Sequence, residues 1–190
     1  MPTADVAITD FLEDPHQDQV MDFLVDWVSG SRAAAEQHVA DHADGRGTTL
    51  TARLGRTIAG LVTVRWTSNN PALADHNIPL VHQLIVVTEY RRQGIATALM
   101  DAAEHLAAQR GRTAVGITVG LFDEYGPAQR LYAKRGYLPD GRGACRGRTP
   151  LHEGQTVTID HSLIIWLTKE LADVQAARPT ARDGANPACS

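Results

Sequence analysis

The polar and apolar positions at the start of the chain predict one strand and two helices. Residues 6–9 predict a short strand. Residues 14–28 place apolar side chains at helical spacing and predict an amphipathic helix, in which Asp14 is expected to cap the first turn. A second helix is expected over residues 32–42. Trp27 shares the apolar face of the first helix, so we expect its ring in the core.

The next stretch predicts a β-hairpin, a loop and a buried strand. The hairpin strands are expected over residues 48–53 and 57–66. Gly60 interrupts the second of them, where an isolated glycine marks a bulge or a close approach of another backbone. Residues 67–79 are polar and rich in turn-forming residues, so they predict a long loop. The apolar run of residues 80–87 predicts a largely buried strand.

The second half of the chain predicts two more helices and three more strands. In chain order, we expect a helix that ends at Gly111, a strand over residues 113–119, a helix over 128–134, and a final pair of strands over 155–159 and 162–168. The complete order predicts an α/β fold, a mixed sheet flanked by helices, in a single domain over residues 1–171. Residues 172–190 are rich in Ala, Pro and Arg and are expected to form a disordered tail.

Composition and charge narrow the class of protein. The chain has 190 residues, of which 43% are hydrophobic and 21% charged, as in a soluble globular protein. Its net charge of -4 and its lack of a Lys/Arg block give no support for a nucleic-acid or acidic-membrane partner. The sequence shows neither the pattern of a secretory signal nor an apolar run of membrane-spanning length. We therefore expect a cytoplasmic protein.

Metal and disulfide chemistry are not predicted. The two cysteines, Cys145 and Cys189, give neither a disulfide framework nor a zinc pattern. His38 and His42 have the spacing of metal ligands on a helix, but no third ligand accompanies them. We therefore expect no metal.

A candidate binding site lies where the strand over residues 80–87 leads into the next helix. A helix N-terminus carries free N–H groups and partial positive charge, which bind phosphate. Gly94 lets the backbone approach a phosphate without an intervening side chain, and Arg91 and Arg92 add positive charge. The turn has neither the Rossmann glycines nor the P-loop Gly-Lys-Ser/Thr ending. The residues alone predict an anion site, with a solvated basic turn as the alternative.

Two blocks of sequence resemble the GNAT family of N-acetyltransferases. Within Leu84–Leu99, residues 91–96 (Arg-Arg-Gln-Gly-Ile-Ala) are similar to the family's acetyl-CoA motif, Gln/Arg-x-x-Gly-x-Gly/Ala. Ala128–Tyr137 resembles the family's Ala-x-x-Leu-Tyr helix, which runs into Gly-Phe or Gly-Tyr. The blocks stand in the family's order, and the resemblance covers roughly residues 5–170. It implies a mostly antiparallel sheet with a splayed central strand pair.

The resemblance also implies how acetyl-CoA is held. In the family, the pantetheine arm lies in the gap between the splayed strands like an added strand, and the pyrophosphate lies on the turn. The implied cofactor-binding residues are Leu84, Ile85, Val86, Arg91, Arg92, Gln93, Gly94, Ile95, Ala96, Thr97 and Ala128.

Two tyrosines near the second block bear on the chemistry. Tyr132 matches the family tyrosine that donates a proton to the departing thiolate; its alternative role is to pack the helix. Tyr125 stands where many members have an Asn that touches the pantetheine. The resemblance therefore leaves the cofactor contact at position 125 open.

The acceptor side of the site is less defined. The resemblance implies direct attack of an amine on the thioester, which requires that the amine lose a proton. His82 shares a face with Leu84 and Val86 by strand alternation and is a candidate base; a hydrogen-bonded core histidine is the alternative. Four further candidate substrate residues lie in or next to predicted loops: Trp66, Asp75, Asp123 and Glu124. Their alternatives are a core tryptophan and solvated loop charges.

The resemblance implies an enzyme that moves an acetyl group from acetyl-CoA to a primary amine. The acidic charge and the long loop favour a small cationic acceptor, such as an aminoglycoside-type antibiotic or an amino sugar. A protein or peptide N-acetyltransferase and a non-catalytic acyl-CoA-binding regulatory module are the alternatives. Homodimers are common in the family, and the final strands are candidates for such an interface.

Overall fold

The computed structural model describes residues 6–172, and within them the chain forms a sheet of eight strands in the order β1-β2-β3-β4-β5-β8-β6-β7. The strands are β1 (Val6–Asp10), β2 (Gly47–Leu54), β3 (Thr57–Arg65), β4 (Leu80–Val86), β5 (Ala114–Gly120), β6 (Leu138–Arg146), β7 (Thr149–Pro150) and β8 (Leu163–Glu170). The α-helices are α1 (Gln17–Leu24), α2 (Arg32–Ala43), α3 (Pro71–Ala74), α4 (Ile95–Gln109) and α5 (Gly126–Lys134).

Neighbouring strands of the sheet are antiparallel, except for β4 and β5, which are parallel. The predicted fold class, a mixed and mostly antiparallel sheet flanked by helices, is confirmed. A single domain over residues 1–171 stays a prediction. All but the first residue of the expected tail over residues 172–190 lies outside the described residues.

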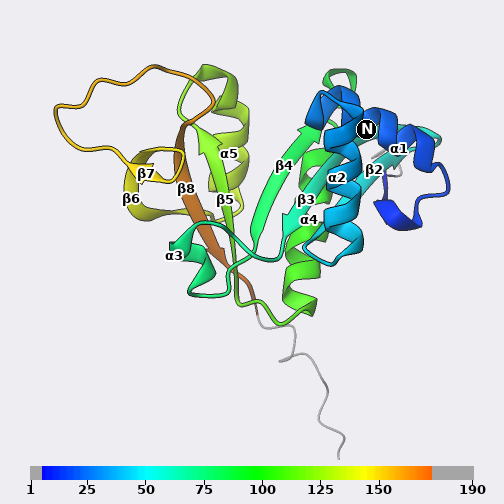
Figure 1. The fold of residues 1–190 in the computed structure, drawn as a ribbon, viewed down its shortest axis with the longest axis horizontal. Coiled ribbons are helices and arrows are strands. Elements are labelled where there is room, and N and C mark those ends of the chain that lie inside the picture. The colour runs from blue at the N-terminus through cyan, green and yellow to red at the C-terminus, as the bar shows by residue number, and fades with distance from the viewer. Residues whose placement is uncertain (1–5, 173–190) are drawn as a thin grey trace, which may run out of the picture.

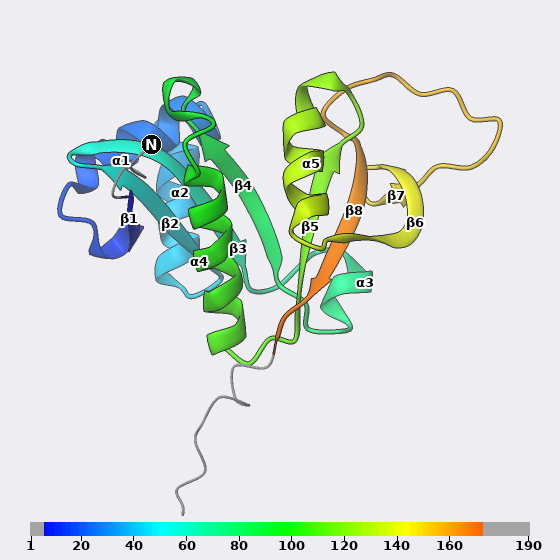
Figure 2. The ribbon, with the colours of Figure 1, turned by 180° about the vertical axis from the view of Figure 1, so that it is seen from behind.

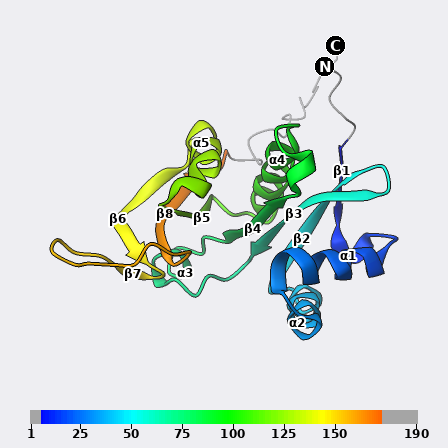
Figure 3. The same cartoon turned by 90° about the horizontal axis from the view of Figure 1, so that it is seen from above.

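Helices cover both faces of the sheet (Figures 1 and 2). α1 and α2 lie on one face, and the short α3 lies on the same side, nearer to β5. α4 and α5 lie on the opposite face, on either side of the boundary between β4 and β5. Figure 3, seen from above, shows these two layers with the sheet between them. We call them the α2 face and the α4 face.

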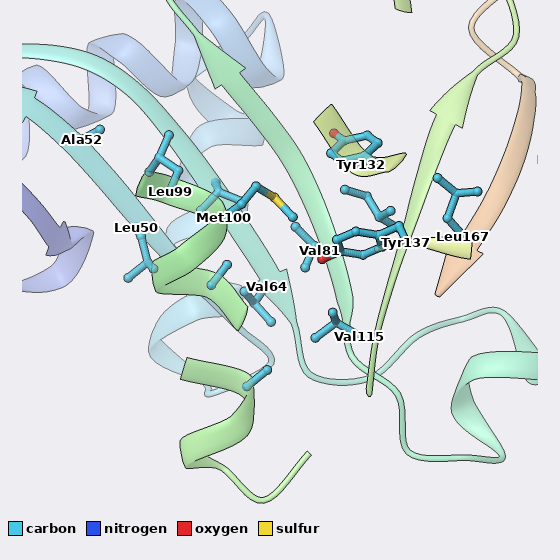
Figure 4. Close-up of a cluster of buried hydrophobic side chains, with 14 of the residues drawn as sticks. Leu50, Ala52, Val64, Val81, Leu99, Met100, Val115, Tyr132, Tyr137 and Leu167 are labelled. Carbon is cyan, nitrogen blue, oxygen red and sulfur yellow. The ribbon is translucent and has the colours of Figure 1, made fainter. Parts of the chain in front are cut away.

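The main hydrophobic cluster lies on the α4 face (Figure 4). It receives alternate residues of β5: Val115, Ile117 and Val119. The residue between the first two, Gly116, faces Leu73 of α3 on the other side. A second cluster lies between α1, α2 and β3, and a third lies under α3. The period of two along β5 therefore assigns each of its residues to one face.

Gly60 accounts for the close contact between β3 and β4. A Cβ atom at this position would lie 2.5 Å from the carbonyl oxygen of Ile85 and 3.3 Å from the Leu99 side chain. The register between β2 and β3 also shifts at Ala52, opposite Gly60. The predicted bulge or close approach at Gly60 is therefore confirmed.

The predicted role of Asp14 as a helix cap is wrong. α1 begins at Gln17, and the residue before it, His16, occupies the cap position. One carboxylate oxygen of Asp14 accepts the backbone N–H of His16, and the other lies 2.7 Å from Nε of Arg53. The side chains of Asp14 and Arg53 are 0% and 7% exposed. The carboxylate is thus the partner of a buried arginine on β2. The spacing of residues in the helix does not predict this pairing.

The predicted core position of Trp27 is also wrong, because its side chain is 42% exposed. α1 does not continue with a regular α-helical period; Val25–Ser29 forms a π-helical turn that ends at Gly30. The wider turn changes the direction in which each side chain points. Trp27 stacks on Phe23 at 5.9 Å between ring centroids instead of entering the core.

The final pair of strands is predicted only in part. β8 forms where the second of them was expected, but residues 155–159 are irregular, and β8 pairs with β5 and β6. β6 lies in the Gly- and Arg-rich stretch that was expected to be a loop. Its register with β8 shifts between Pro139 and Ala144, so the strand lacks the regular alternation by which strands are recognised.

A buried ionic cluster joins α4 to the C-terminal half of the chain. Glu104 on α4 accepts hydrogen bonds from Arg135 at 2.8 Å, Lys169 at 2.6 Å and the Tyr137 hydroxyl at 3.1 Å. Burial by itself raises the pKa of Glu104, but the hydrogen bonds and charges of Arg135 and Lys169 outweigh burial and hold the pKa below its ordinary value. The carboxylate is therefore charged in the folded protein at neutral pH.

Candidate active site

β4 and β5 pair only at the first two residues of β4 and then diverge (Figures 1 and 2). Leu80 pairs with Gly116 and Val81 with Ile117, and the described chain contains no later pair between these strands. The facing edges of β4 and β5 beyond this point have no partner strand. Such edges offer backbone donors and acceptors to an added extended molecule.

A bulge in β4 changes the face of the sheet toward which its side chains point. Gln83 has a positive φ of 54°, and the register with β3 shifts around it. His82 pairs with Thr63 of β3, whereas Leu84 and Val86 pack against the main cluster on the α4 face. The prediction that His82 shares a face with Leu84 and Val86 is wrong, because strict alternation stops at the bulge. A non-glycine residue at positive φ leaves no signal in the sequence.

His82 lies in a polar cluster beneath α2. The hydroxyl of Thr63 hydrogen-bonds that of Thr49 at 2.9 Å, and Thr49 hydrogen-bonds Nε2 of His38 on α2 at 2.7 Å. Burial, with the positive charges of Arg65 and His38 nearby, lowers the pKa of His82 to about 4. A cavity of about 170 Å³ opens in the same cluster between α2, β2 and β3. His82 is therefore neutral at neutral pH and lies on the α2 face.

The turn before α4 presents free backbone donors. Arg92 and Gly94 have positive φ values of 62° and 86°. Across residues 6–172, no protein oxygen accepts the N–H groups of residues 92–97, and the first helical bond runs from Ala98 N to Gly94 O at 3.0 Å. Free N–H groups at a helix start, preceded by residues of positive φ, are typical of anion-binding loops.

The basic side chains of this turn are exposed. Arg91 donates from Nε to the carbonyl oxygen of Val86 at 3.1 Å, and Gln93 donates to the carbonyl oxygen of Glu89 at 3.2 Å. Within the described part of the chain, neither Arg91 nor Arg92 forms an ion pair. Their positive charges are thus uncompensated beside the free N–H groups.

Tyr132 enters the main cluster from α5 (Figure 4) and is 5% exposed. Its ring lies 5.8 Å from that of Tyr137. The hydroxyl has no hydrogen-bond partner in residues 6–172, and Figure 4 shows it directed to the side of β4. Burial, with a smaller effect of Tyr125, raises the pKa of Tyr132. The phenol is therefore protonated at neutral pH, and its hydroxyl can donate a hydrogen bond.

Tyr125 belongs to an aromatic cluster at the end of β5. Its ring lies directly over Gly120, where a Cβ atom would be 2.3 Å from the ring. The Tyr125 hydroxyl hydrogen-bonds Nδ1 of His161 at 3.1 Å, and Phe122 packs edge-on with ring centroids 4.9 Å apart. Sequence reasoning missed this cluster, because His161 lies far along the chain and belongs to no motif.

The other candidate substrate residues differ in burial. Trp66 is 5% exposed; its Nε1 donates to Thr48 at 3.1 Å, and the guanidinium of Arg110 lies 4.0 Å from the ring centroid. The Trp66 ring therefore closes the core and has no free face for a substrate. The three acidic candidates are exposed: Asp75 lies in the turn after α3, and Asp123 and Glu124 lie in a 3-10 turn after β5.

The two histidines with metal-ligand spacing on α2 have other partners. Nδ1 of His42 accepts the N–H of Thr49 at 3.1 Å, and its Nε2 lies 3.2 Å from Asp10. His38 hydrogen-bonds Thr49, as described above. Residues 6–172 contain no group of three or more His, Cys, Asp or Glu side chains arranged to hold a metal ion. No helix in this range is long and apolar enough to cross a membrane.

Comparison with known proteins defines the class to which the chain belongs. A model of the acetyltransferase (GNAT) family matches residues 10–137. The protein is therefore a member of the GNAT family of acetyltransferases, as the two sequence blocks predicted. No protein of curated function matches the sequence.

Solved structures of acetyltransferases share the fold. A protein assigned to the GNAT family from Desulfovibrio desulfuricans is 16% identical with a TM-score of 0.63, over 88% of this chain and 99% of that chain. An aminoglycoside 6'-acetyltransferase type Ii is 19% identical with a TM-score of 0.61, over 86% and 96%. A nourseothricin acetyltransferase is 21% identical with a TM-score of 0.51, over 68% of each chain. The TM-scores show a common fold, and identities of this size show no more than the fold.

Proposed function

We propose that the protein transfers an acetyl group from acetyl-CoA to a primary amine. The observation that carries this proposal is the unpaired gap between β4 and β5, joined to the free N–H groups of residues 92–97. The gap takes an extended chain and the N–H groups take a diphosphate. Because β4 leads directly into this turn, one extended cofactor can occupy both.

The proposal gives each part of the cofactor its partners in the chain. The backbone of Leu84, Ile85 and Val86 binds the pantetheine arm, and the N–H groups of residues 92–97 bind the pyrophosphate. Arg91 and Arg92 add charge at the rim, where guanidinium groups suit phosphate oxygens. The bond from Arg91 to the carbonyl of Val86 supports this arrangement, because it holds the end of β4 against the turn. The small Ala128 at the start of α5 leaves room for the cofactor.

Acetyl transfer requires two proton movements. The amine attacks the thioester carbon, a C–N bond forms, and the C–S bond breaks to release a thiolate. We assign protonation of the thiolate to Tyr132, whose hydroxyl is protonated and has no hydrogen-bond partner among the described residues. The proton lost by the amine leaves on the α2 face, where His82 is neutral at neutral pH. A pKa of about 4 makes His82 a weak base, so water takes the proton onward.

We propose a small cationic amine, such as an aminoglycoside-type antibiotic or an amino sugar, as the acceptor. The net charge of -4 and the exposed carboxylates of Asp123 and Glu124 at the end of β5 suit a cation. Two of the solved structures that share the fold are antibiotic acetyltransferases, which also favours a small cationic acceptor. The alternatives are a peptide or protein acceptor and a non-catalytic acyl-CoA-binding module. Cytoplasmic location and a homodimer stay predictions.

A thiol-release assay with acetyl-CoA tests the proposed function against a panel of aminoglycosides, polyamines and peptides. Turnover with an aminoglycoside or polyamine supports the small cationic acceptor, and turnover with peptides alone favours the peptide reading. Acetyl-CoA binding without turnover on any amine favours the non-catalytic module. If the protein does not bind acetyl-CoA, the proposed function is wrong.

A further inference from the structure

We propose that Tyr125, held by His161, is a specificity-determining residue that forms one wall of the acceptor site on the α2 face. This inference rests on the proposed function, because it presupposes an acceptor amine. Its basis is the direction in which the end of β5 presents its residues, together with the contacts that fix the Tyr125 ring.

The alternation of β5 places the Tyr125 ring on the α2 face. β5 pairs with β8 from Ala114 to Gly120 without a register shift, so its alternation is unbroken. Three of its residues enter the main cluster on the α4 face: Val115, Ile117 and Val119. Gly116 and Gly120 therefore point to the α2 face, where Leu73 of α3 fills the space at Gly116 and the Tyr125 ring fills the space at Gly120. The ring also touches the edge of the main cluster, so it covers the end of the strand.

The cofactor and the acceptor approach the gap from different sides. The turn at the start of α4 lies with the helices of the α4 face (Figure 2), and the Tyr132 side chain packs in the main cluster on that face. A cofactor held by this turn leaves the α2 face of the gap open to an acceptor. His82 lies on that face on the β4 side, and Tyr125 lies there on the β5 side. These two residues thus flank the route of an amine to the thioester.

Three contacts fix the Tyr125 ring. Gly120 leaves space for it, because a Cβ atom would lie 2.3 Å from the ring. Phe122 packs against it at an interplanar angle of 88°. The hydroxyl hydrogen-bonds Nδ1 of His161, which stands two residues before β8 in the long connection over residues 151–162. The hydrogen bond therefore ties this connection to the end of β5.

The chemistry of the ring indicates what kind of acceptor it recognises. Its hydroxyl is engaged by His161, and the ring is half-buried, so part of an aromatic surface remains for a ligand. Aromatic faces bind ammonium groups through their quadrupole and the flat apolar faces of sugar rings through dispersion. We infer that the acceptor carries an ammonium group or an apolar ring face close to the nitrogen that is acetylated, as polyamines and amino sugars do.

The test compares Tyr125→Asn, Tyr125→Phe and His161→Ala with the wild-type protein. Steady-state rates are measured with kanamycin and with spermidine, and the Kd of acetyl-CoA is measured by calorimetry. Tyr125→Asn is expected to raise KM for the amine about fivefold or more, as loss of a cation–π or stacking contact requires. The Kd of acetyl-CoA is expected to stay within about twofold of wild type.

Two further variants test whether the hydrogen bond between Tyr125 and His161 positions the ring. Tyr125→Phe and His161→Ala break the same hydrogen bond and keep a ring at position 125. Each is expected to raise KM for the amine by a smaller and similar factor, and the double variant is expected to be no worse than either, because the two residues share one interaction. Additive effects in the double variant overturn the coupling of Tyr125 to His161.

Two outcomes overturn the main inference. If Tyr125→Asn leaves KM for the amine unchanged, Tyr125 does not contact the acceptor. If the variant raises the Kd of acetyl-CoA about tenfold, Tyr125 contacts the cofactor instead. If no amine is acetylated by the wild-type protein, the proposed enzymatic function fails. The acetyl-CoA affinities of the variants then still decide whether Tyr125 contacts the cofactor.

Discussion

Replacing Gly60 with alanine tests how β3 shapes the candidate site. The new methyl group would lie 2.5 Å from the carbonyl oxygen of Ile85, on the segment of β4 that we propose to bind pantetheine. Ordinary contact needs at least 3.4 Å, so the strands must separate locally by about 0.9 Å. The bond from Val87 N to Ala59 O, now 2.9 Å, stretches beyond hydrogen-bonding distance if the strands separate in that direction.

The magnitude follows from three contributions. Overpacking costs about 1–3 kcal/mol, and the lost hydrogen bond costs about 1 kcal/mol. Replacing glycine with alanine also reduces the conformational freedom of the unfolded chain, which offsets about 0.5–1 kcal/mol of this loss in the free energy of unfolding. Gly60→Ala is therefore expected to lower the free energy of unfolding by about 2 kcal/mol, which corresponds to a Tm lower by roughly 4–8 °C. Acetyl-CoA binding is expected to weaken, because the backbone of β4 moves.

Thermal unfolding followed by circular dichroism, with calorimetry of acetyl-CoA binding, measures both effects. Gly126→Ala is the matched control. Gly126 has a helical φ of -52°, and its added Cβ atom would lie 3.7 Å from the nearest atom, the end of the Arg130 side chain. The control is expected to unfold at or above the wild-type temperature. A Gly60→Ala protein as stable as wild type, with unchanged affinity for acetyl-CoA, would show that the close approach of β3 and β4 does not require glycine at this position.

Four further predictions test other parts of the account. Tyr132→Phe is expected to lower kcat about a hundredfold with little change in the Kd of acetyl-CoA; unchanged turnover removes its role as the acid. Arg91→Glu is expected to weaken acetyl-CoA binding about tenfold or more by calorimetry, and equal affinity would show that the pyrophosphate lies elsewhere. Arg53→Met leaves the carboxylate of Asp14 buried without its charged partner, so urea denaturation should show a loss of about 3 kcal/mol; a loss below about 1 kcal/mol contradicts a buried pair. The lowered pKa of Glu104 means that it contributes stability above its ordinary pKa of 4.5, and this stability is lost as pH falls through its folded value. Glu104→Gln should therefore be less stable than wild type at pH 7 and show a smaller further loss in acid; parallel pH profiles would contradict this.

The sequence predicts the turn before α4, with its free N–H groups, and the hairpin, because each depends on local chemistry. Gly94 sits at a helix start with arginines before it, and the structure shows free N–H groups there. Gly60 is an isolated glycine in a strand, and the structure shows the close approach that such a glycine indicates. In both places the signal lies within a few residues of the feature that it describes.

The features that the sequence did not predict depend on contacts between distant segments or on irregular backbone. The bulge at Gln83 turns His82 to the α2 face, although nothing about glutamine indicates a positive φ. The π-helical turn takes Trp27 out of the core in the same way. The contact between Tyr125 and His161 joins residues far apart in the chain. Each of these requires the folded backbone to be known.

Calorimetric titration of acetyl-CoA into the wild-type protein measures whether the gap between β4 and β5 and the turn before α4 form a cofactor site. The account predicts saturable binding of one acetyl-CoA per chain, competition by free coenzyme A, and weaker binding to Arg91→Glu. Desulfo-coenzyme A is expected to compete as well, because the turn at residues 92–97 holds the pyrophosphate rather than the thiol. Absence of binding at millimolar acetyl-CoA would contradict the account.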